Sequence, residues 1–199
     1  MKIREVKIHN WRSILDMTFS CEDLMILIGQ NNHGKSNILS AILFFFGEIG
    51  LNELDFHRNS KELFVEILFE DLDEHDQTTF KKYLVSKQSM RVRKDAVKDG
   101  GFSYHGYVER PKEDWLHEEN IANYTKREDA EGLPLYDLLP TSGRITKDAL
   151  KQAQDQYIQK HRDDLNFSYE VESGPFLGAK NVAKGMFGEV YFIPSVKKA

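Results

Sequence analysis

The sequence holds a single cysteine, no long apolar stretch and no apolar leader at its amino terminus. One thiol, at Cys21, cannot form an internal disulfide, and cysteine-poor chains are typical of reducing compartments. The longest largely apolar run, Ile38–Phe46, is far shorter than the roughly 20 residues that cross a bilayer as a helix. The first residues alternate charged and aliphatic side chains, unlike a secretory signal. These absences predict a cytoplasmic protein without a membrane-spanning segment.

An excess of basic residues is also lacking. The 27 Lys and Arg residues are outnumbered by 32 Asp and Glu residues, which gives a formal net charge of −5 at pH 7. Any contact with nucleic acid must therefore come from a local basic patch. Disorder over most of the chain is excluded, because 40% of the residues are hydrophobic and 12% are aromatic. At 199 residues the chain is long enough for one large globular domain or two small ones.

Hydrophobic periodicity divides the chain into expected strands and helices. Alternation predicts strands in 2–9 and 15–20, and the unbroken apolar run 24–28 is typical of a strand buried on both faces. From Lys35 to about Glu48 apolar residues cover most sides of a helix, so this helix should be enclosed and should stop near Gly47. Further expectations are a strand at 63–69, an amphipathic helix at 73–87, a strand pair 90–97 and 102–108 joined at 99–101, a solvated excursion or mobile loop at 109–131, a polar helix at 146–165 and a buried strand at 189–193.

One segment carries a specific chemical signature. Gly29–Ser36, with the sequence Gly-Gln-Asn-Asn-His-Gly-Lys-Ser, matches the pattern G-x-x-x-x-G-K-[ST] at every fixed position. By average residue usage, such a match arises by chance in about one chain in a hundred of this length. The expected strand before it and the expected helix after it form the strand–loop–helix setting of a phosphate-binding loop. The alternative is a glycine-rich turn that only caps a helix. It does not explain the lysine, which has little structural use in such a turn.

Each fixed position of the pattern has a physical task. Gly29 and Gly34 permit the backbone path that gathers N–H groups around a phosphate chain. The helix that begins near Lys35 directs its unpaired N–H groups and its positive dipole end at the same phosphates. Lys35 supplies a compact charge to the β- and γ-phosphate oxygens, and the Ser36 hydroxyl is a ligand for Mg²⁺. The predicted cofactors are therefore ATP and Mg²⁺.

The flanks of this motif resemble a known family. Asn10-Trp-Arg-Ser13 before a strand, followed by Gly29-Gln-Asn-Asn-His-Gly-Lys-Ser-Asn37, is similar to the opening of ABC-type ATPase heads of the RecF and structural-maintenance-of-chromosomes group. The Asn31-Asn32 pair and the late Tyr191–Ser195 stretch look most like the OLD (overcoming lysogenization defect) family. The resemblance implies that nucleotide is contacted from the turn before the second strand as well as from the loop. The implied nucleotide-binding residues are Arg12, Ser13, Gly29, Gln30, Asn31, Asn32, His33, Gly34, Lys35, Ser36 and Asn37, with Ser36 also holding the metal.

The same resemblance implies a fold class and partners. The expected fold is α/β, a P-loop NTPase in the form of an ABC-type ATPase head lobe with an antiparallel β layer, and the domain is expected to be incomplete within this chain. Residues 1–70 and the strand 189–194 would form the core and the β layer, and about 71–188 would be a mixed helical and β insertion. Full OLD proteins clamp ATP between two heads, act on DNA through a C-terminal Toprim nuclease and often serve in defence against phage. The implied partners are a second head, DNA and an accessory protein subunit.

Other elements of ATP hydrolysis are absent from the sequence. No Leu-Ser-Gly-Gly-like signature occurs, no Q-loop glutamine can be placed, and no catalytic residue is identified. The run Phe64–Asp71 ends in two carboxylates like a Walker B strand, but Glu66 interrupts it, and the run fits the antiparallel layer better. The acidic stretch 70–76 with His75 fits a helix start rather than a metal site. The basic stretch 91–98 is either a phosphate contact or, in preference, a solvated strand edge.

Three functions remain open on the sequence alone. The first is the ATP-binding lobe of an OLD-like ATPase, coupled to DNA processing by an associated endonuclease. The second is a module that holds nucleotide as a regulatory or structural ligand, or an SMC/RecF-like DNA-repair module without nuclease activity. The third, a small kinase or GTPase, is disfavoured because the guanine motif Asn-Lys-x-Asp is absent.

Overall fold

The computed structural model describes residues 1–30, 34–86, 88–179, 182 and 185–193. The chain forms two compact units, one made by residues 1–108 with the described residues from 171 onward, and the other by residues 109–170. The first boundary between the units lies between residues 108 and 109. The reason is that strands within 84–108 pair with the sheet of the first unit.

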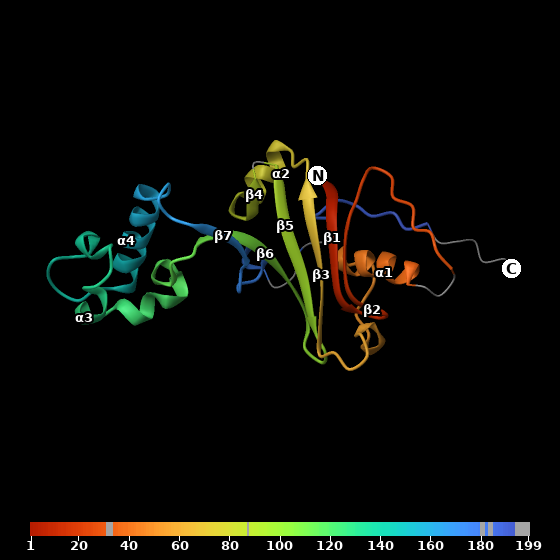
Figure 1. Ribbon diagram of the computed structural model, residues 1–199, viewed down its shortest axis with the longest axis horizontal. Coiled ribbons are helices and arrows are strands. Elements are labelled where there is room, and N and C mark those ends of the chain that lie inside the picture. Colours follow the sequence, from red (N-terminus) through yellow and green to blue (C-terminus); the bar gives the residue numbers. More distant parts are fainter. Residues whose placement is uncertain (31–33, 87, 180–181, 183–184, 194–199) are drawn as a thin grey trace. The chain divides into compact units, whose positions relative to one another are not determined.

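The described part of the chain contains a seven-stranded sheet, and its strands up to residue 108 form the framework of the first unit (Figure 1). The strands are β1 (Lys2–Trp11), β2 (Ile14–Ser20), β3 (Glu62–Glu70), β4 (Leu84–Ser86), β5 (Ser89–Val97), β6 (Gly101–Pro111) and β7 (Phe167–Val171). Their order is β2-β1-β3-β5-β6-β7, and β4 pairs with β5 beside this path. The pairings from β2 through β6 are antiparallel. The predicted strand pair 90–97 and 102–108 is confirmed as β5 and β6.

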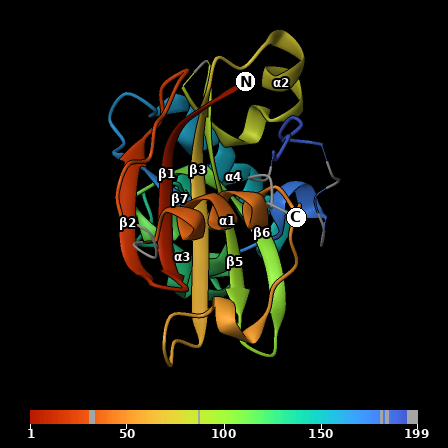
Figure 2. The same ribbon diagram turned by 90° about the vertical axis from the view of Figure 1, so that its right-hand side faces the viewer.

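Helix α1 (Lys35–Phe45) lies across one face of this sheet (Figure 2). Phe44 and Phe45 are fully buried, and the Phe44 ring stacks on the Trp11 ring at 5.0 Å. The helix is followed by Gly47, whose φ of 77° is left-handed and whose N–H donates to the Phe44 carbonyl. The prediction of an enclosed helix with a glycine stop is confirmed.

Aromatic rings from distant parts of the sequence fill the core of the first unit. Phe187, which follows the 3-10 turn Phe176–Gly178, lies 5.5 Å from the rings of Phe45 and Phe69 and 5.8 Å from that of Tyr104. The last three rings come from α1, β3 and β6. Burying one such side chain is worth about 1.5–3 kcal/mol. This packing explains why the chain after β7 belongs to the first unit.

Two predicted buried strands are not formed. Residues 24–28 and 189–193 adopt no strand conformation. Alternate side chains of the first run, Leu24, Ile26 and Ile28, are 70–91% exposed, and the three large side chains of the second run are 55–88% exposed. A strand is buried on both faces only when neighbouring strands and covering layers are present, and none of the described strands pairs with either run.

The helix predicted over 73–87 is shorter, because α2 spans only Glu74–Thr79. A 3-10 turn (Lys81–Tyr83) follows and leads directly into β4. Phe80 and Tyr83 are both buried, so the chain turns toward the core before a longer helix forms. Tertiary burial has overridden the local helical pattern.

The second unit is helical and has a core of its own. Helix α4 (Lys147–Lys160) confirms the predicted polar helix. It is preceded by α3 (Arg127–Ala130) and by the 3-10 turns Asp114–Leu116, Glu118–Tyr124 and Tyr136–Leu138. The solvated excursion predicted at 109–131 is wrong, because side chains of this stretch enter the core. The buried core residues are Leu116, Ile121, Ala130, Leu135, Leu139, Ile145, Leu150 and Ala153.

The net negative charge of the chain lies in this second unit. Residues 109–170 hold 14 acidic and 9 basic residues, whereas the rest of the chain holds 18 of each. The unit with the phosphate-loop motif is therefore electroneutral, and it does not repel a polyanion as a whole. No helix in the described part of either unit is both long and apolar enough to cross a membrane.

Candidate nucleotide-binding site

The phosphate-loop motif lies at the amino end of α1. Gly34 precedes the helix with φ 83° and ψ −2°, a left-handed conformation that favours glycine. A Cβ atom at this position would also lie 3.4 Å from the Ser13 hydroxyl oxygen. The chain therefore turns sharply into α1, whose first N–H groups have no partner within the helix. The predicted contacts of Asn31, Asn32 and His33 lie outside the described residues.

The Lys35 side chain folds back over the loop. Its Nζ atom donates to the carbonyl oxygens of Gly29 and Gln30, at 2.6 Å in each case. Among the described residues its partners are these two neutral carbonyls rather than a carboxylate. An ammonium group held at a glycine-rich loop without an anionic partner fits an anionic ligand such as a phosphate chain.

Ser36 lies in the first turn of α1, and its side chain is exposed. A hydroxyl at this place suits Mg²⁺, which prefers oxygen ligands and retains several waters. The described part of the chain contains no cluster of three His, Cys, Asp or Glu side chains that could hold a metal ion. A Mg²⁺ ion bound at this loop would take Ser36 as a protein ligand, and phosphate oxygens and water would complete its coordination.

The turn between β1 and β2 lies against this helix. The Asn37 side-chain amide donates to Ser13 Oγ at 2.7 Å. Trp11 Nε1 donates to Ser40 Oγ at 3.0 Å, and that hydroxyl donates to the Asn37 carbonyl at 3.0 Å. Three of the predicted site residues, Ser13, Gly34 and Asn37, are therefore neighbours.

Arg12 is held by a segment that follows α1. The 3-10 turn Glu53–Asp55 places Asp55, only 2% exposed, so that its Oδ1 atom accepts from Arg12 Nε at 2.8 Å. The Asp55 carbonyl accepts from the Arg12 N–H at 2.7 Å, and His57 Nδ1 lies 2.7 Å from the Arg12 carbonyl. These contacts hold Arg12 at φ 49°, which non-glycine residues rarely adopt. Among the described residues, the two terminal guanidinium nitrogens of Arg12 donate no hydrogen bond.

Asp55 has almost no signal in the sequence. It ends the short stretch 52–55, with the sequence Asn-Glu-Leu-Asp, which is typical of any turn. Its partner Arg12 lies 43 residues earlier, and only the packing of the turn against the end of β1 brings the two side chains together. Sequence reasoning therefore missed this residue.

We expect Asp55→Ala to lower the free energy of unfolding by about 2–3 kcal/mol, because it removes a buried carboxylate that accepts two hydrogen bonds. Its second oxygen accepts from the Asn52 N–H at 2.8 Å. Denaturant unfolding measures the loss. Asp23→Ala is the matched control, since the Asp23 side chain is exposed and its pair with Lys2 is worth at most about 1 kcal/mol. Equal small losses in both variants would contradict a structural role for Asp55.

The candidate Walker B stretch belongs to the antiparallel layer, as expected. Strand β3 pairs antiparallel with β1 on one side and β5 on the other. Within it Glu66, 3% exposed, accepts from Arg91 at 2.7 Å and from the Tyr107 hydroxyl at 2.5 Å. Burial and this bond raise the pKa of Tyr107 to about 12, so the hydroxyl remains a donor at neutral pH. Glu66 is thus engaged within the sheet and is not placed to activate a water.

The basic stretch 91–98 is divided between the two faces of the sheet instead of forming one patch. Arg93 pairs with Asp95 at 2.7 Å on one face, whereas Lys94 is buried on the other. Strand β5 lies between β3 and β6, so the prediction of a solvated strand edge is wrong. The arrangement gives no support to a phosphate-backbone contact by this stretch.

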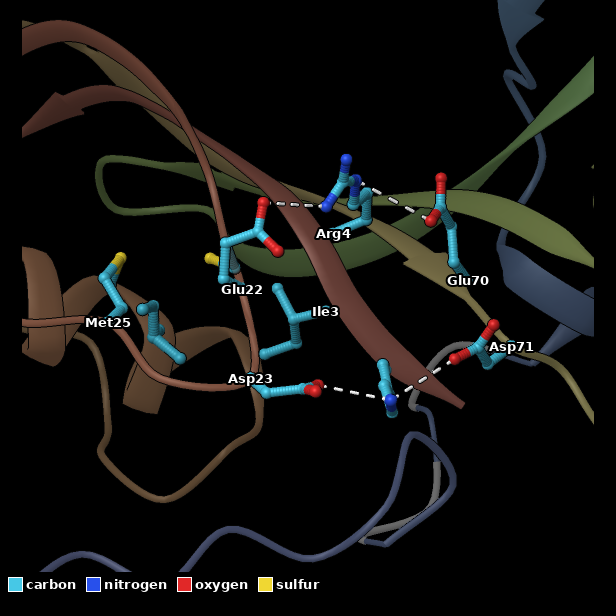
Figure 3. Close-up of a pocket in the computed structure, with 10 residues that line it drawn as sticks. Ile3, Arg4, Glu22, Asp23, Met25, Glu70 and Asp71 are labelled. Atoms are coloured by element: carbon cyan, nitrogen blue, oxygen red, sulfur yellow. Dashed lines mark hydrogen bonds and ion pairs between the residues drawn. The ribbon is translucent and has the colours of Figure 1, made fainter.

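A cavity of about 600 Å³ is lined by β1, by the segment after β2 and by the end of β3 (Figure 3). Lys2 pairs there with Asp23 at 3.2 Å and with Asp71 at 3.5 Å, and Arg4 pairs in the same way with two glutamates. Each of these two cations pairs with two carboxylates. The acidic residues at the end of β3, Glu70 and Asp71, are therefore partners in ion pairs. Burial raises the pKa of the Cys21 thiol in this wall, which keeps the thiol protonated at neutral pH.

The chain matches one known family over most of its length. A family model described as an AAA ATPase domain matches residues 1–173. No curated protein matches the chain. The family match covers the phosphate-loop motif, the sheet and the second unit together.

Several solved structures share a distant likeness. One comes from work on the structural biochemistry of ATP-driven dimerization and DNA-stimulated activation of SMC ATPases. It is 17% identical in sequence, and the match covers 77% of this chain and 79% of that chain at a TM-score of 0.42. The SMC head domain from Thermotoga maritima is 18% identical, with 53% and 37% covered at a TM-score of 0.39. An SMC head bound to the C-winged helix domain of ScpA is 14% identical, with 94% and 71% covered at a TM-score of 0.42.

Proposed function

The chain belongs to the AAA ATPase domain family, and on that premise we propose that it binds ATP with Mg²⁺ through Gly29–Ser36. Its fold is that of a P-loop ATPase with an antiparallel β layer, in which the helix that carries the loop crosses the sheet. The observation that carries the proposal is the Lys35 ammonium group, which contacts neutral loop carbonyls at the amino end of α1. A phosphate chain would replace those carbonyls and would also meet the positive end of the helix dipole.

Each residue of the site would make a different contact with ATP or Mg²⁺. Gly34 gives the backbone its turn, Lys35 would neutralise the β- and γ-phosphate oxygens, and Ser36 would ligate Mg²⁺. Arg12, held by Asp55, would offer its terminal nitrogens to an anion from the turn beside the helix. The remaining proposed contacts are Ser13, Gly29, Gln30, Asn31, Asn32, His33 and Asn37.

We further infer that the chain is the N-terminal part of one ABC-type ATPase domain. The runs 24–28 and 189–193 present apolar side chains to solvent, and such runs are normally buried by neighbouring strands. ATP hydrolysis also needs carboxylates that complete the Mg²⁺ site and orient a water, and the described residues form no such cluster. Further strands of a longer polypeptide would cover both runs and supply these groups.

Calorimetric titration of the chain with ATP, with and without Mg²⁺, and with GTP tests the proposal. We expect ATP binding that Mg²⁺ strengthens, weaker GTP binding and turnover near background. A chain that binds no ATP would refute the proposed function, and a preference for GTP would favour the kinase or GTPase alternative. Rapid turnover by the chain alone would contradict the inference that the domain is partial.

For the intact protein we propose an OLD-like role in the cytoplasm, supported by the Asn31-Asn32 pair and the Tyr191–Ser195 stretch. Two heads would close around ATP, with DNA and an accessory subunit as partners and an associated endonuclease that acts in defence against phage. The alternative is a regulatory or SMC/RecF-like repair module. Incubation of the intact protein with plasmid DNA, ATP and Mg²⁺ distinguishes them: we expect cleavage, and ATP-dependent DNA binding without cleavage would favour the alternative.

A further inference from the structure

Two side chains of the β5–β6 hairpin hold the carboxyl end of α1. Lys94 Nζ donates to the Phe44 carbonyl at 2.5 Å, and the Tyr104 hydroxyl donates to the Phe45 carbonyl. Both acceptors belong to the last turn of the helix. The Phe44 carbonyl also accepts from the Gly47 N–H. The hairpin thus binds the end of α1 opposite to the phosphate loop.

Lys94 is a charged residue in an apolar interior. It is 1% exposed, and its Nζ atom lies 4.1 Å from the ring centroid of Phe44, 4.2 Å from that of Phe102 and 4.7 Å from that of Tyr104. Among the described residues, its polar partner is the helix carbonyl and not a carboxylate. Burying an ammonium group without a counter-ion is costly, and an apolar side chain would fill the same space at lower cost. The charge itself therefore needs an explanation.

We propose that Lys94 and Tyr104 are positioning residues for the phosphate loop. Helix α1 is a rigid element of 11 residues with Lys35 and Ser36 in its first turn. A cation at its carboxyl end interacts favourably with the helix dipole, and bonds to two consecutive carbonyls fix the helix along its axis and against rotation. The hairpin thereby sets the place of Lys35 relative to the Arg12–Ser13 turn. This inference rests on the proposed nucleotide binding.

The two bonds from Lys94 and Tyr104 to the end of α1 are called the anchor below. The charge of the anchor depends on pH, because the Lys94 side chain is buried. Burial lowers the pKa of Lys94 to about 8 from the ordinary 10.5. It faces Phe44 of α1, Phe102 and Tyr104 of β6 and, in register, Val65 of β3. Tyr104 is the titratable member of this set, and burial raises its pKa, so it stays a neutral donor. Between pH 8 and 10.5 the unfolded chain holds more protons, so rising pH stabilises the fold while it removes the charge from the anchor.

The test compares ATP affinity and thermal unfolding in Lys94→Met and in a control, Lys98→Met, which alters an exposed lysine just after β5. At pH 7 we expect Lys94→Met to weaken ATP binding roughly tenfold, without lowering the melting temperature of the nucleotide-free chain. The control should change neither quantity. Raising the pH from 7 to about 9 should weaken ATP binding to the wild type and not to Lys94→Met. A folded Lys94→Met with wild-type affinity would overturn the proposal.

Tyr104→Phe carries the test if Lys94→Met does not fold, because it removes one hydroxyl and keeps the ring. We expect ATP binding several-fold weaker than in the wild type, and faster amide hydrogen exchange at residues 46–48, whose N–H groups bond to the last turn of α1. If Tyr104→Phe shows both the ATP affinity and the hydrogen exchange of the wild type, the proposal that these residues position the loop is overturned. A wild-type chain that binds no ATP would refute the proposed function instead, and exchange at 46–48 in the nucleotide-free variants would still decide whether the hairpin holds the helix.

Discussion

Lys35→Ala is expected to weaken ATP binding by roughly 10- to 100-fold, the cost of losing charge-assisted hydrogen bonds to phosphate oxygens. The side chain contacts the carbonyls of Gly29 and Gln30 at the surface of the loop and takes no part in the hydrophobic core. Its removal should therefore leave the free energy of unfolding almost unchanged. Calorimetric titration with ATP and Mg²⁺ measures the affinity, and thermal unfolding checks the fold.

Lys81→Ala is the matched control for this prediction. Lys81 is an exposed lysine in the 3-10 turn after α2, and its substitution removes the same charge from the same unit. The control should bind ATP like the wild type. Equal weakening in both variants would indicate a general effect of net charge, and undiminished binding by Lys35→Ala would contradict the assignment of the loop.

Gly106→Ala should lower the free energy of unfolding by about 3 kcal/mol or more, at the upper end of overpacking effects. A Cβ atom at this position of β6 would lie 2.2 Å from Cδ1 and 2.5 Å from Cε1 of the Tyr83 ring. That ring is fixed, because it stacks on Phe176 at 4.5 Å and its hydroxyl accepts from the Leu177 N–H at 2.9 Å. Either the ring or the strand must then move. Denaturant unfolding followed by circular dichroism measures the change.

A double-mutant cycle tests the mechanism of this loss. Tyr83→Ala should cost much less in the Gly106→Ala background than in the wild type, because the added methyl group no longer meets a ring. Gly50→Ala is the control substitution, since no atom lies within 4 Å of a Cβ atom built there, and it should change stability by less than about 0.5 kcal/mol. Additive losses in the cycle would show that Gly106 acts through its backbone and not through the ring contact.

Features fixed by neighbours in the chain were predictable. The spacing of Gly29, Gly34, Lys35 and Ser36 located the phosphate loop, because the residues that shape such a loop are consecutive. The alternation in β1, the enclosed helix ended at Gly47 and the β5–β6 hairpin followed for the same reason. Periodicity also has a limit. It identified 24–28 as apolar, but whether such a run is buried depends on strands that pair with it, and the described strands do not.

The sequence by itself determined the fold class and the place of the phosphate loop, since both depend on local spacing and periodicity. The tertiary structure alone decided which distant side chains contact Arg12 and helix α1. Asp55 reaches Arg12 from beyond α1, and Lys94 reaches the far end of the helix from β5. The tertiary structure also decided that side chains of residues 109–131 enter a helical core instead of remaining in solvent. These outcomes depend on the free energy of burying charges and rings contributed by segments far apart in the chain, and no local pattern specifies such partners.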